Sequence, residues 1–334
     1  MKIAILDDYQ DAVRGLACFK LTEGHEVKVF NSTARGLGQL AIRLAPFDAL
    51  VLIRERSSFN RALLSRLPNL KLLSQTGKAG QHIDVAAATE LGIAIAEGVG
   101  SPTAPAELTW ALVMAAQRKI VPYAQHLKEG LWQTASIEPA LNTLGSTLQG
   151  RTLAIWGYGR IGQLVAGYGR AFGMQVVVWG SETSRNKAVA DGYAAAASRE
   201  AFFAEADVLS VHLRLNDATR GIVTAADLAR MQPTALFVNT SRAELVATGA
   251  LEQALTQGRP GYAALDVFES EPLAPTSELL RIPTVLATPH LGYVEQDSYE
   301  LYFRHAFQNI VDFEAGKFDA IHNPDFQHNA RSQS

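Results

Sequence analysis

Three segments of the sequence place polar side chains directly after apolar runs that predict β-strands. They are Val238–Arg242, Ala264–Pro272 and Thr288–Gly292. Within them, His290 can donate or accept a proton near neutral pH, and the Arg242 guanidinium can hold a carboxylate and polarise a carbonyl. Reduction of a keto group by hydride needs both functions, because a proton must reach the growing alkoxide. Since carboxyl ends of parallel strands line one ligand crevice, we expect these segments to converge.

A glycine-rich turn predicts a dinucleotide site. The run Gly157-Tyr158-Gly159-Arg160-Ile161-Gly162 follows the apolar stretch Thr152–Trp156 and opens a helical stretch. Gly157 allows the tight turn, Gly159 lets the backbone approach a pyrophosphate, and Gly162 lets the helix pack on the strand. The amides of Arg160 and Ile161 are then among the donors that a helix N-terminus offers to phosphate.

The position that reads the adenosine ribose should follow the next strand, at Gly180 or Ser181, where an NAD site usually carries an acid. Ser181, Ser184 and Arg185 would suit a 2′-phosphate, which favours NADP. Glu182 keeps NAD open, because its carboxylate could turn inward to a ribose diol.

Alternating short apolar runs and helical stretches predict an α/β chain with two doubly wound parallel sheets. The expected strands of the first domain are Ile3–Leu6, Glu26–Phe30, Ala49–Leu52, Leu70–Ser74 and Ile93–Ala96. Those of the second are Thr152–Trp156, Gln175–Trp179, Val208–Leu213, Leu236–Asn239, Tyr262–Leu265 and Thr284–Ala287.

Glycines and prolines gather in Gly98–Pro105, which predicts a crossover between the domains. An apolar helix is expected over Ala106–Arg118 and another over Gln296–Ala315. The polar tail Gln327–Ser334 is expected to fray.

Composition excludes several classes of protein. The 334 residues suit two domains, and 30 Lys+Arg against 33 Asp+Glu give a net charge of −3, which does not favour nucleic acid or an anionic membrane as partner. The single cysteine, Cys18, cannot form an intrachain disulfide, and acidic Asp7 and Asp8 follow the first apolar residues too early for a signal peptide. We therefore expect a cytoplasmic protein without a membrane span.

Together, these motifs resemble the D-isomer-specific 2-hydroxyacid dehydrogenase family, which includes phosphoglycerate dehydrogenases and glyoxylate/hydroxypyruvate reductases. The resemblance covers nearly the whole chain and rests on the glycine run, Asn239–Arg242, Asp266–Phe268, Glu271-Pro272 and Pro289-His290. It implies a Rossmann NAD(P)-binding domain, residues 101–290, inserted into a flavodoxin-like substrate domain, residues 1–100 and 291–334. It also implies a homodimer that acts on a small 2-keto or 2-hydroxy acid.

The resemblance assigns roles to residues that, taken alone, would more often be structural or solvated. His290 is the implied acid/base, Glu271 its hydrogen-bonding partner, and Arg242 the clamp for the substrate carboxylate. Asp266 would contact the nicotinamide end of the cofactor. The remaining implied cofactor contacts are His212 and Thr240.

A first-domain loop, Gln75–Gly80, resembles the family's backbone site for the substrate carboxylate. Gly77 would allow close approach of the backbone, and Lys78 would add a positive charge or simply face solvent. Arg54 or Arg56 could reach the same pocket, and the sequence does not choose between them. Trp132 and Tyr293 are candidate pocket walls, although such aromatics are more often core or interface residues.

Two positions depart from the family's pattern: Ala243 stands where glycine often follows the arginine, and Arg214 stands where many members have proline. Glu271 argues against a formate dehydrogenase, because the resemblance to that class would require glutamine at this position. The alternative from another class is a non-catalytic dinucleotide sensor like the C-terminal-binding corepressors. We expect instead a reductase of a small keto acid such as glyoxylate or hydroxypyruvate.

Overall fold

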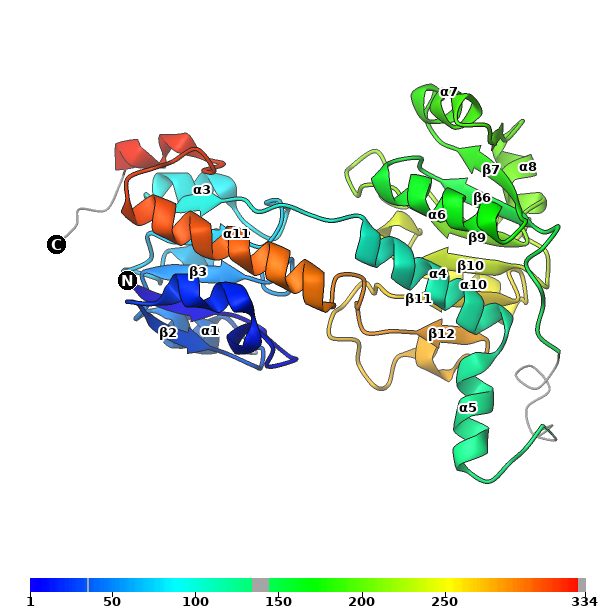
Figure 1. Cartoon of the computed structure of the whole chain (residues 1–334), viewed down its shortest axis with the longest axis horizontal. Helices are drawn as coiled ribbons and strands as arrows, with labels where there is room; N and C mark the ends of the chain where they lie inside the picture. Colours follow the sequence, from blue (N-terminus) through cyan, green and yellow to red (C-terminus); the bar gives the residue numbers. More distant parts are fainter. Residues whose placement is uncertain (35, 134–143, 330–334) are drawn as a thin grey trace. The chain divides into compact units, whose positions relative to one another are not determined.

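A computed structural model describes residues 1–34, 36–133 and 144–329 of the chain (Figure 1). The chain divides into two compact units. Unit 1 comprises Met1–Ser101 and Glu295–Ser334, and unit 2 comprises Pro102–Val294. Unit 1 therefore takes residues from both ends of the sequence, whereas unit 2 is continuous.

Unit 1 is built on a five-stranded parallel sheet with the order β2-β1-β3-β4-β5. Its strands are β1 (Lys2–Ile5), β2 (Glu26–Val29), β3 (Ala49–Leu52), β4 (Leu72–Gln75) and β5 (Ala94–Ala96). Its helices are α1 (Leu37–Leu44), α2 (Arg61–Leu64), α3 (Val85–Glu90) and α11 (Gln296–Glu314), with 3₁₀ turns at Val13–Gly15, Ala17–Thr22 and Pro324–Asn329. The central strands β3 and β4 are buried throughout, as expected for a sheet covered on both faces.

The C-terminal segment is tied into the sheet of unit 1. The Ile95 amide donates to the Asn323 side chain over 2.8 Å, and the His322 amide donates to the Ile95 carbonyl over 2.7 Å. On the helix preceding this segment, the Ala306 carbonyl accepts from the buried Ser74 hydroxyl of β4. The two ends of the chain thus share one hydrogen-bonded core.

Unit 2 holds a seven-stranded parallel sheet with the order β12-β11-β10-β9-β6-β7-β8. Its strands are β6 (Thr152–Trp156), β7 (Gln175–Trp179), β8 (Ala194–Ala195), β9 (Val208–Val211), β10 (Leu236–Asn239), β11 (Tyr262–Leu265) and β12 (Val285–Ala287). Its α-helices are α4 (Thr103–Gln117), α5 (Ile120–Lys128), α6 (Arg160–Ala171), α7 (Glu182–Ala190), α8 (Arg199–Ala204), α9 (Ala225–Leu228) and α10 (Ala250–Thr256). Its 3₁₀ turns are Ala243–Leu245 and Glu278–Arg281.

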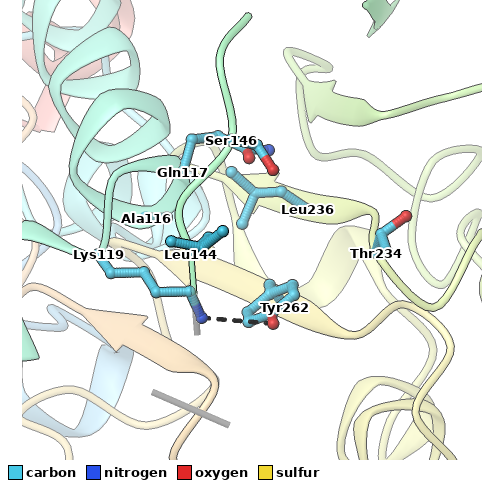
Figure 2. A pocket seen from close by; sticks show the side chains of 8 residues that line it. All are labelled: Ala116, Gln117, Lys119, Leu144, Ser146, Thr234, Leu236 and Tyr262. Carbon is cyan, nitrogen blue, oxygen red and sulfur yellow. Dashed lines mark hydrogen bonds between the residues drawn. The ribbon is translucent and has the colours of Figure 1, made fainter. Parts of the chain in front are cut away.

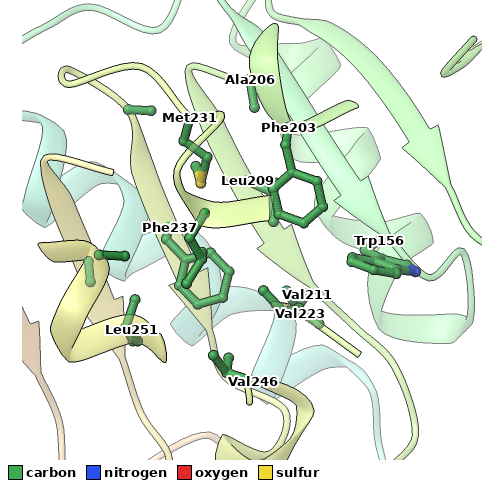
Figure 3. Close-up of a cluster of buried hydrophobic side chains, with 14 of the residues drawn as sticks. Trp156, Phe203, Ala206, Leu209, Val211, Val223, Met231, Phe237, Val246 and Leu251 are labelled. Atoms are coloured by element: carbon green, nitrogen blue, oxygen red, sulfur yellow. The ribbon is translucent and has the colours of Figure 1, made fainter. Parts of the chain in front are cut away.

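One face of this sheet carries an aromatic and aliphatic core (Figure 3). Trp156 of β6 makes edge-on contacts with Phe202 and Phe203 of α8, and Phe237 of β10 is fully buried in the same cluster. Such a packed layer holds the strands, and hence the loops at their carboxyl ends, in fixed positions.

The predicted fold class is confirmed: both sheets are parallel and α/β in organisation. Several predicted bounds were wrong at their ends. β4 begins at Leu72 rather than Leu70, and β9 ends at Val211 rather than Leu213, because the His212 carbonyl turns against Gly157. The helix expected from Ala106 begins at Thr103, since Pro105 fits the first turn of a helix, where an amide proton is not needed.

Two further corrections concern segments with weak apolar signals. The alanine-rich stretch at Ala194–Ala195 forms the edge strand β8, which was not predicted. The tail was expected to fray from Gln327, yet Pro324–Asn329 forms a 3₁₀ turn with Phe326 buried; residues 330–334 lie outside the described part. Within the described residues, no helix is long and apolar enough to span a bilayer.

Candidate active site

The first turn of the candidate dinucleotide site is sterically restricted to glycine. Gly157 follows β6 with a φ of 100°, and a Cβ there would lie 2.6 Å from the His212 carbonyl oxygen. A Cβ on Gly162 would lie 2.2 Å from the Gly157 carbonyl oxygen. Both distances are too short for real atoms, so these two glycines bring β6, α6 and the end of β9 together.

The start of α6 has the properties that a pyrophosphate needs. Gly159 is the N-cap, and among the described residues no side chain caps this end. A Cβ on Gly159 would meet no described atom within 4 Å, so the space beside the first amides is open. The amides of Arg160 and Ile161 can therefore donate to an anion at the positive end of the helix dipole. These residues fit a dinucleotide.

The second turn, after β7, lies beside the first. The Gly157 amide donates to the Trp179 carbonyl over 3.0 Å, and a Cβ on Gly180 would lie 3.8 Å from the Gly157 nitrogen. Ser181 caps α7 by accepting from the Ser184 amide, and the Ser181 hydroxyl donates to the Ser184 hydroxyl over 3.1 Å. The Arg185 guanidinium lies 4.8 Å from the Trp179 ring centroid. Two hydroxyls and a cation thus gather next to the glycine turn.

His212 directly follows β9, which lies between β6 and β10 in the sheet. Its Nε2 is 2.9 Å from the Ser210 hydroxyl, and burial lowers its pKa to about 4. Its imidazole is therefore neutral near neutral pH and adds no positive charge beside the glycine turn of the candidate dinucleotide site.

Three adjacent strands end at the segments with catalytic potential. β10, β11 and β12 are neighbours, with Asn239 in register with Leu265 and Leu265 in register with Ala287. Parallel pairing therefore brings the loops that carry Arg242, Glu271 and His290 to the same edge of the sheet.

The loop of Arg242 is held by the buried side chain of Asn239. Its amide nitrogen donates to the Arg242 carbonyl over 2.8 Å, and its oxygen accepts from the Ser241 amide over 3.0 Å. Nearby, the Thr240 hydroxyl lies 2.7 Å from the Thr109 hydroxyl of α4. The guanidinium is thus presented from a rigid turn, with its NH1 donating to the Ser241 carbonyl.

His290 and Glu271 form a close pair. The distance from His290 Nδ1 to Glu271 Oε2 is 2.7 Å, and Glu271 Oε1 accepts from the Phe268 amide over 2.9 Å. Burial opposes ionisation of Glu271, but the hydrogen bond and charge of His290, the Phe268 amide and the charge of Arg242 outweigh it and lower its pKa. The carboxylate is therefore ionised and orients the ring, leaving Nε2 as the nitrogen that can transfer a proton.

Asp266, at the end of β11, is enclosed by donors. Its Oδ1 accepts from the Thr288 hydroxyl over 2.6 Å and the Leu291 amide over 2.7 Å, while Oδ2 accepts from the Gly292 amide over 2.9 Å. The residue has no exposed surface, and burial raises its pKa despite these bonds. Asp266 thereby fixes the turn in which His290 adopts a left-handed φ of 54°.

In unit 1, Arg54 is the arginine that lies against the Gly77 loop. A Cβ on Gly77 would be 2.3 Å from Arg54 NH1, so a side chain there would displace the end of the Arg54 side chain. The Lys78 ammonium is 2.7 Å from Glu97, whose pKa is lowered: burial raises it, but Lys78, the Ala79 amide and His322 outweigh that effect. The charge of Lys78 is therefore partly neutralised within its own unit.

The other candidates of the pocket have different surroundings. Arg56 donates to the Asp7 carbonyl and stacks 4.5 Å from the Tyr9 ring centroid. The buried Tyr293 packs edge-on against His290 with ring centroids 5.4 Å apart, whereas Trp132 is 68% exposed.

The structure thus gathers Arg242, Glu271 and His290 at one sheet edge, and the glycine turn with Gly180 and His212 at another part of it. Sequence reasoning missed Asn239 and Thr288 as positioning residues. Both residues stood in segments that the sequence had singled out, Asn239 at the end of an apolar strand and Thr288 before Pro289-His290, but nothing in the sequence indicated that their side chains position Arg242 and Asp266.

Comparison with known proteins identifies the family. The profile of "D-isomer specific 2-hydroxyacid dehydrogenase, NAD binding domain" matches residues 110–292. The chain is 38% identical to a glyoxylate reductase of Aeropyrum pernix over 257 residues, which is 76% of each chain. It is similar to the crystal structure of a phosphoglycerate oxidoreductase from Vibrio cholerae, with 56% identity, a TM-score of 0.91 and coverage of 95% of this chain and 99% of that one.

The crystal structure of an oxidoreductase from Ralstonia solanacearum, described as a D-3-phosphoglycerate dehydrogenase, is also similar. The two chains are 58% identical, with a TM-score of 0.95 and 98% coverage of each. The chain belongs to the D-isomer specific 2-hydroxyacid dehydrogenase family and is an NAD(P)-dependent oxidoreductase acting on CH–OH groups. Members of this family act on small 2-hydroxy and 2-keto acids, and unit 2 contains the NAD-binding domain.

Proposed function

We propose that this chain reduces a small 2-keto acid, such as glyoxylate or hydroxypyruvate, to the D-2-hydroxy acid, with Arg242, Glu271 and His290 as its catalytic residues. The observation that carries the proposal is the 2.7 Å pair between His290 and the ionised Glu271, on strand ends adjacent to that of Arg242. An imidazole, its orienting carboxylate and a guanidinium are the groups that keto-acid reduction requires.

In the reduction, Arg242 holds the substrate carboxylate and draws electron density from the carbonyl. A reduced nicotinamide, when bound, supplies the hydride that C2 accepts. His290 in its doubly protonated form gives the Nε2 proton to the carbonyl oxygen, while Glu271 stabilises the imidazolium through Nδ1. The reverse oxidation returns the proton to Nε2.

We assign Asp266 to the nicotinamide end of the cofactor, where it holds the turn that follows His290. We assign Thr240 and His212 to the same cofactor as further contacts. In unit 1, we assign substrate binding to the backbone around Gly77, with Lys78 beside it. The packing of Arg54 against Gly77 favours Arg54 over Arg56 as the cation that assists this loop.

For the cofactor, we propose a preference for NADP over NAD. The hydroxyls of Ser181 and Ser184 and the cation of Arg185 support it, because each can donate to a 2′-phosphate. Glu182 is exposed in the first turn of α7 and is the group that would oppose it.

We also propose that the protein is a homodimer in which α5 contributes to the interface. Every residue of α5 is at least partly exposed, and Ile120 and Leu127 are 52% and 55% exposed. In Figure 1, α5 continues from the end of α4 away from the sheet. Sedimentation of a Leu127→Asp variant should give monomers if this face carries the contact, and an unchanged dimer would remove α5 from it.

The reaction is tested by following oxidation of NADPH and, separately, NADH with glyoxylate, hydroxypyruvate, pyruvate and phenylpyruvate. Turnover with a preferred keto acid and faster reaction with NADPH support both assignments. Equal or faster reaction with NADH overturns the NADP preference alone. Absence of turnover while cofactor still binds would favour the sensor alternative.

A further inference from the structure

Helix α7 carries the proposed ribose-reading residues at its start, yet little apolar packing holds it in place. Ser181 is its N-cap, and Ser184 and Arg185 follow in its first turn. Among the nine residues of α7, all of which the structure describes, only Ala188 is buried. Most protein helices are held by an apolar face that packs on the core. The position of α7 therefore depends strongly on polar contacts with its neighbours.

Tyr158, the residue between the first two glycines of the dinucleotide turn, makes such a contact at the far end of α7. Its hydroxyl donates to Asp191 Oδ2 over 2.9 Å, and Asp191 is the C-cap of α7. Tyr158 is buried, with 4% of its surface exposed. Burial, and then the hydrogen bond and charge of Asp191, raise the pKa of Tyr158 above its ordinary value. The hydroxyl therefore stays protonated and remains a donor.

The backbone of Tyr158 belongs to a second connection with α7. The Gln163 side chain of α6 donates to the Tyr158 carbonyl over 3.1 Å and accepts from the Lys187 ammonium of α7 over 3.0 Å. In addition, Arg170 of α6 donates to the Asp191 carbonyl over 2.8 Å. These hydrogen bonds hold the C-terminal half of α7 against α6 and the glycine turn.

A dinucleotide has to meet the glycine turn and the start of α7 at the same time, with its pyrophosphate and its adenosine ribose respectively. The two turns are joined at their bases, since the Gly157 amide donates to the Trp179 carbonyl. A helix held only at its start could still tilt, and a tilt would move Ser184 and Arg185 relative to the pyrophosphate site. The contact between Tyr158 and the other end of α7 opposes that motion.

We propose that Tyr158 is a positioning residue, which sets the distance between the pyrophosphate site and the ribose-reading residues by fixing the end of α7. A phenol serves this position because it combines a ring that can be buried with a donor for Asp191. This role rests on the proposed assignment of Ser181, Ser184 and Arg185 to the adenosine end of the cofactor. It does not depend on the identity of the keto acid.

Direct binding of NADPH and NADH, followed by the fluorescence of the reduced nicotinamide, tests this role without turnover. Tyr158→Phe keeps the ring and removes the donor, so it should raise Kd for both dinucleotides by at least about threefold, the effect of one hydrogen bond. Asp191→Ala removes the same bond from an exposed residue and should have the same effect. Because both variants break one interaction, the double variant should bind no more weakly than either single variant. Asp191→Asn, which keeps an acceptor oxygen, should bind as the wild type does.

The matched control is a second tyrosine of unit 2 whose hydroxyl also contacts a charged side chain. Tyr262 begins β11, and its hydroxyl accepts from the Lys119 ammonium over 3.4 Å (Figure 2). Because the strands are parallel, the start of β11 lies at the opposite edge of the sheet from the glycine turn, which follows the end of β6. Tyr262→Phe should therefore leave both Kd values unchanged. In Tyr158→Phe, KM for the keto acid should change less than Kd of the cofactor.

Equal Kd values in the wild type and Tyr158→Phe for both dinucleotides would overturn this role. So would an equal loss of affinity in Tyr262→Phe, additive losses in the double variant, or an Asp191→Asn variant that binds as weakly as Asp191→Ala. Failure of the proposed NADP preference gives a different result: the wild type then binds NADH at least as tightly as NADPH, while Tyr158→Phe still weakens both.

Discussion

Asp266 and Glu271 share one loop after β11, yet the pKa values of their carboxyl groups shift in opposite directions. Asp266 is fully buried, and burial raises its pKa although the Thr288 hydroxyl, the Leu291 and Gly292 amides and the charge of His290 all act to lower it. Glu271 is also partly buried, but it faces His290 and the charge of Arg242, and its pKa is lowered. Burial alone therefore does not decide the direction in which the pKa of a carboxylate shifts; the balance between burial and the hydrogen bonds and charges of its partners does.

This difference separates two kinds of work within the loop. Asp266 holds a turn by accepting three hydrogen bonds, whereas Glu271 places a charge beside the His290 ring, to which we assign the proton transfer. Substitutions at the two positions and at their partners should separate stability from catalysis.

The largest effect is expected at the ring that Glu271 orients. His290→Ala should lower turnover by about 10² to 10⁴-fold, because no proton donor remains for the alkoxide. Cofactor affinity, measured by quenching of tryptophan fluorescence, should change little. Near-normal turnover in this variant would exclude His290 as the acid/base.

Removal of the Asp266 carboxylate should act on the fold. Asp266→Ala leaves two amides and a hydroxyl without their acceptor, which should lower the free energy of unfolding by about 3 kcal/mol. Denaturant unfolding followed by tryptophan fluorescence reports on this unit, since Trp110, Trp132, Trp156 and Trp179 all belong to it. The control is Asp217→Ala, which removes an exposed acid of the same unit. An equal loss of unfolding free energy in both variants would contradict the role of Asp266 in holding the turn.

Arg242→Lys should raise KM for the keto acid by about tenfold with a smaller effect on kcat. A lysine retains the charge but loses one of two parallel hydrogen bonds to the carboxylate. Initial-rate kinetics measure this, with the exposed Arg230→Lys as a matched control. An unchanged KM would remove Arg242 from the substrate carboxylate.

The smallest effects, and the most direct comparison, lie in the pH dependence of stability. Because the pKa of Glu271 is lowered on folding, its contribution is present above its ordinary value of 4.5 and is lost as the pH falls through the folded pKa. Because the pKa of Asp266 is raised, its contribution has the opposite sign: it is present below 3.8 and lost as the pH rises through the folded pKa.

Acidification should therefore destabilise Glu271→Gln less than the wild type and Asp266→Asn more. Unfolding free energies measured from neutral to acidic pH test this. If the slope of unfolding free energy against pH differs from that of the wild type in the same direction in both variants, the two carboxylates do not differ as described.

Much of the fold could be predicted because buried parallel strands are short apolar runs, such as Ala49–Leu52 and Thr152–Trp156. β8 could not, since an exposed Ala-Ala pair at a sheet edge has no apolar signal of its own. The buried turn at Phe326 depends on Asn323, whose amide donates to the Ile93 carbonyl and whose oxygen accepts from Ile95, contacts distant in sequence.

The candidate site shows the same division. Motifs indicated Arg242, Glu271 and His290, because their residue types match a known chemistry. The support given by Asn239, and the contact of Thr240 with Thr109, arise from neighbouring strands and α4 and have no local pattern.

The composition of unit 1 from both chain ends also bears on how the protein is made. Residues 1–101 are synthesised before unit 2, but the hydrogen bonds of β5 with His322 and Asn323 can form only after those residues have been synthesised as well. Unit 2, being continuous, can fold as soon as its own residues have emerged. The middle of the polypeptide can thus become native while the part synthesised before it is still incomplete.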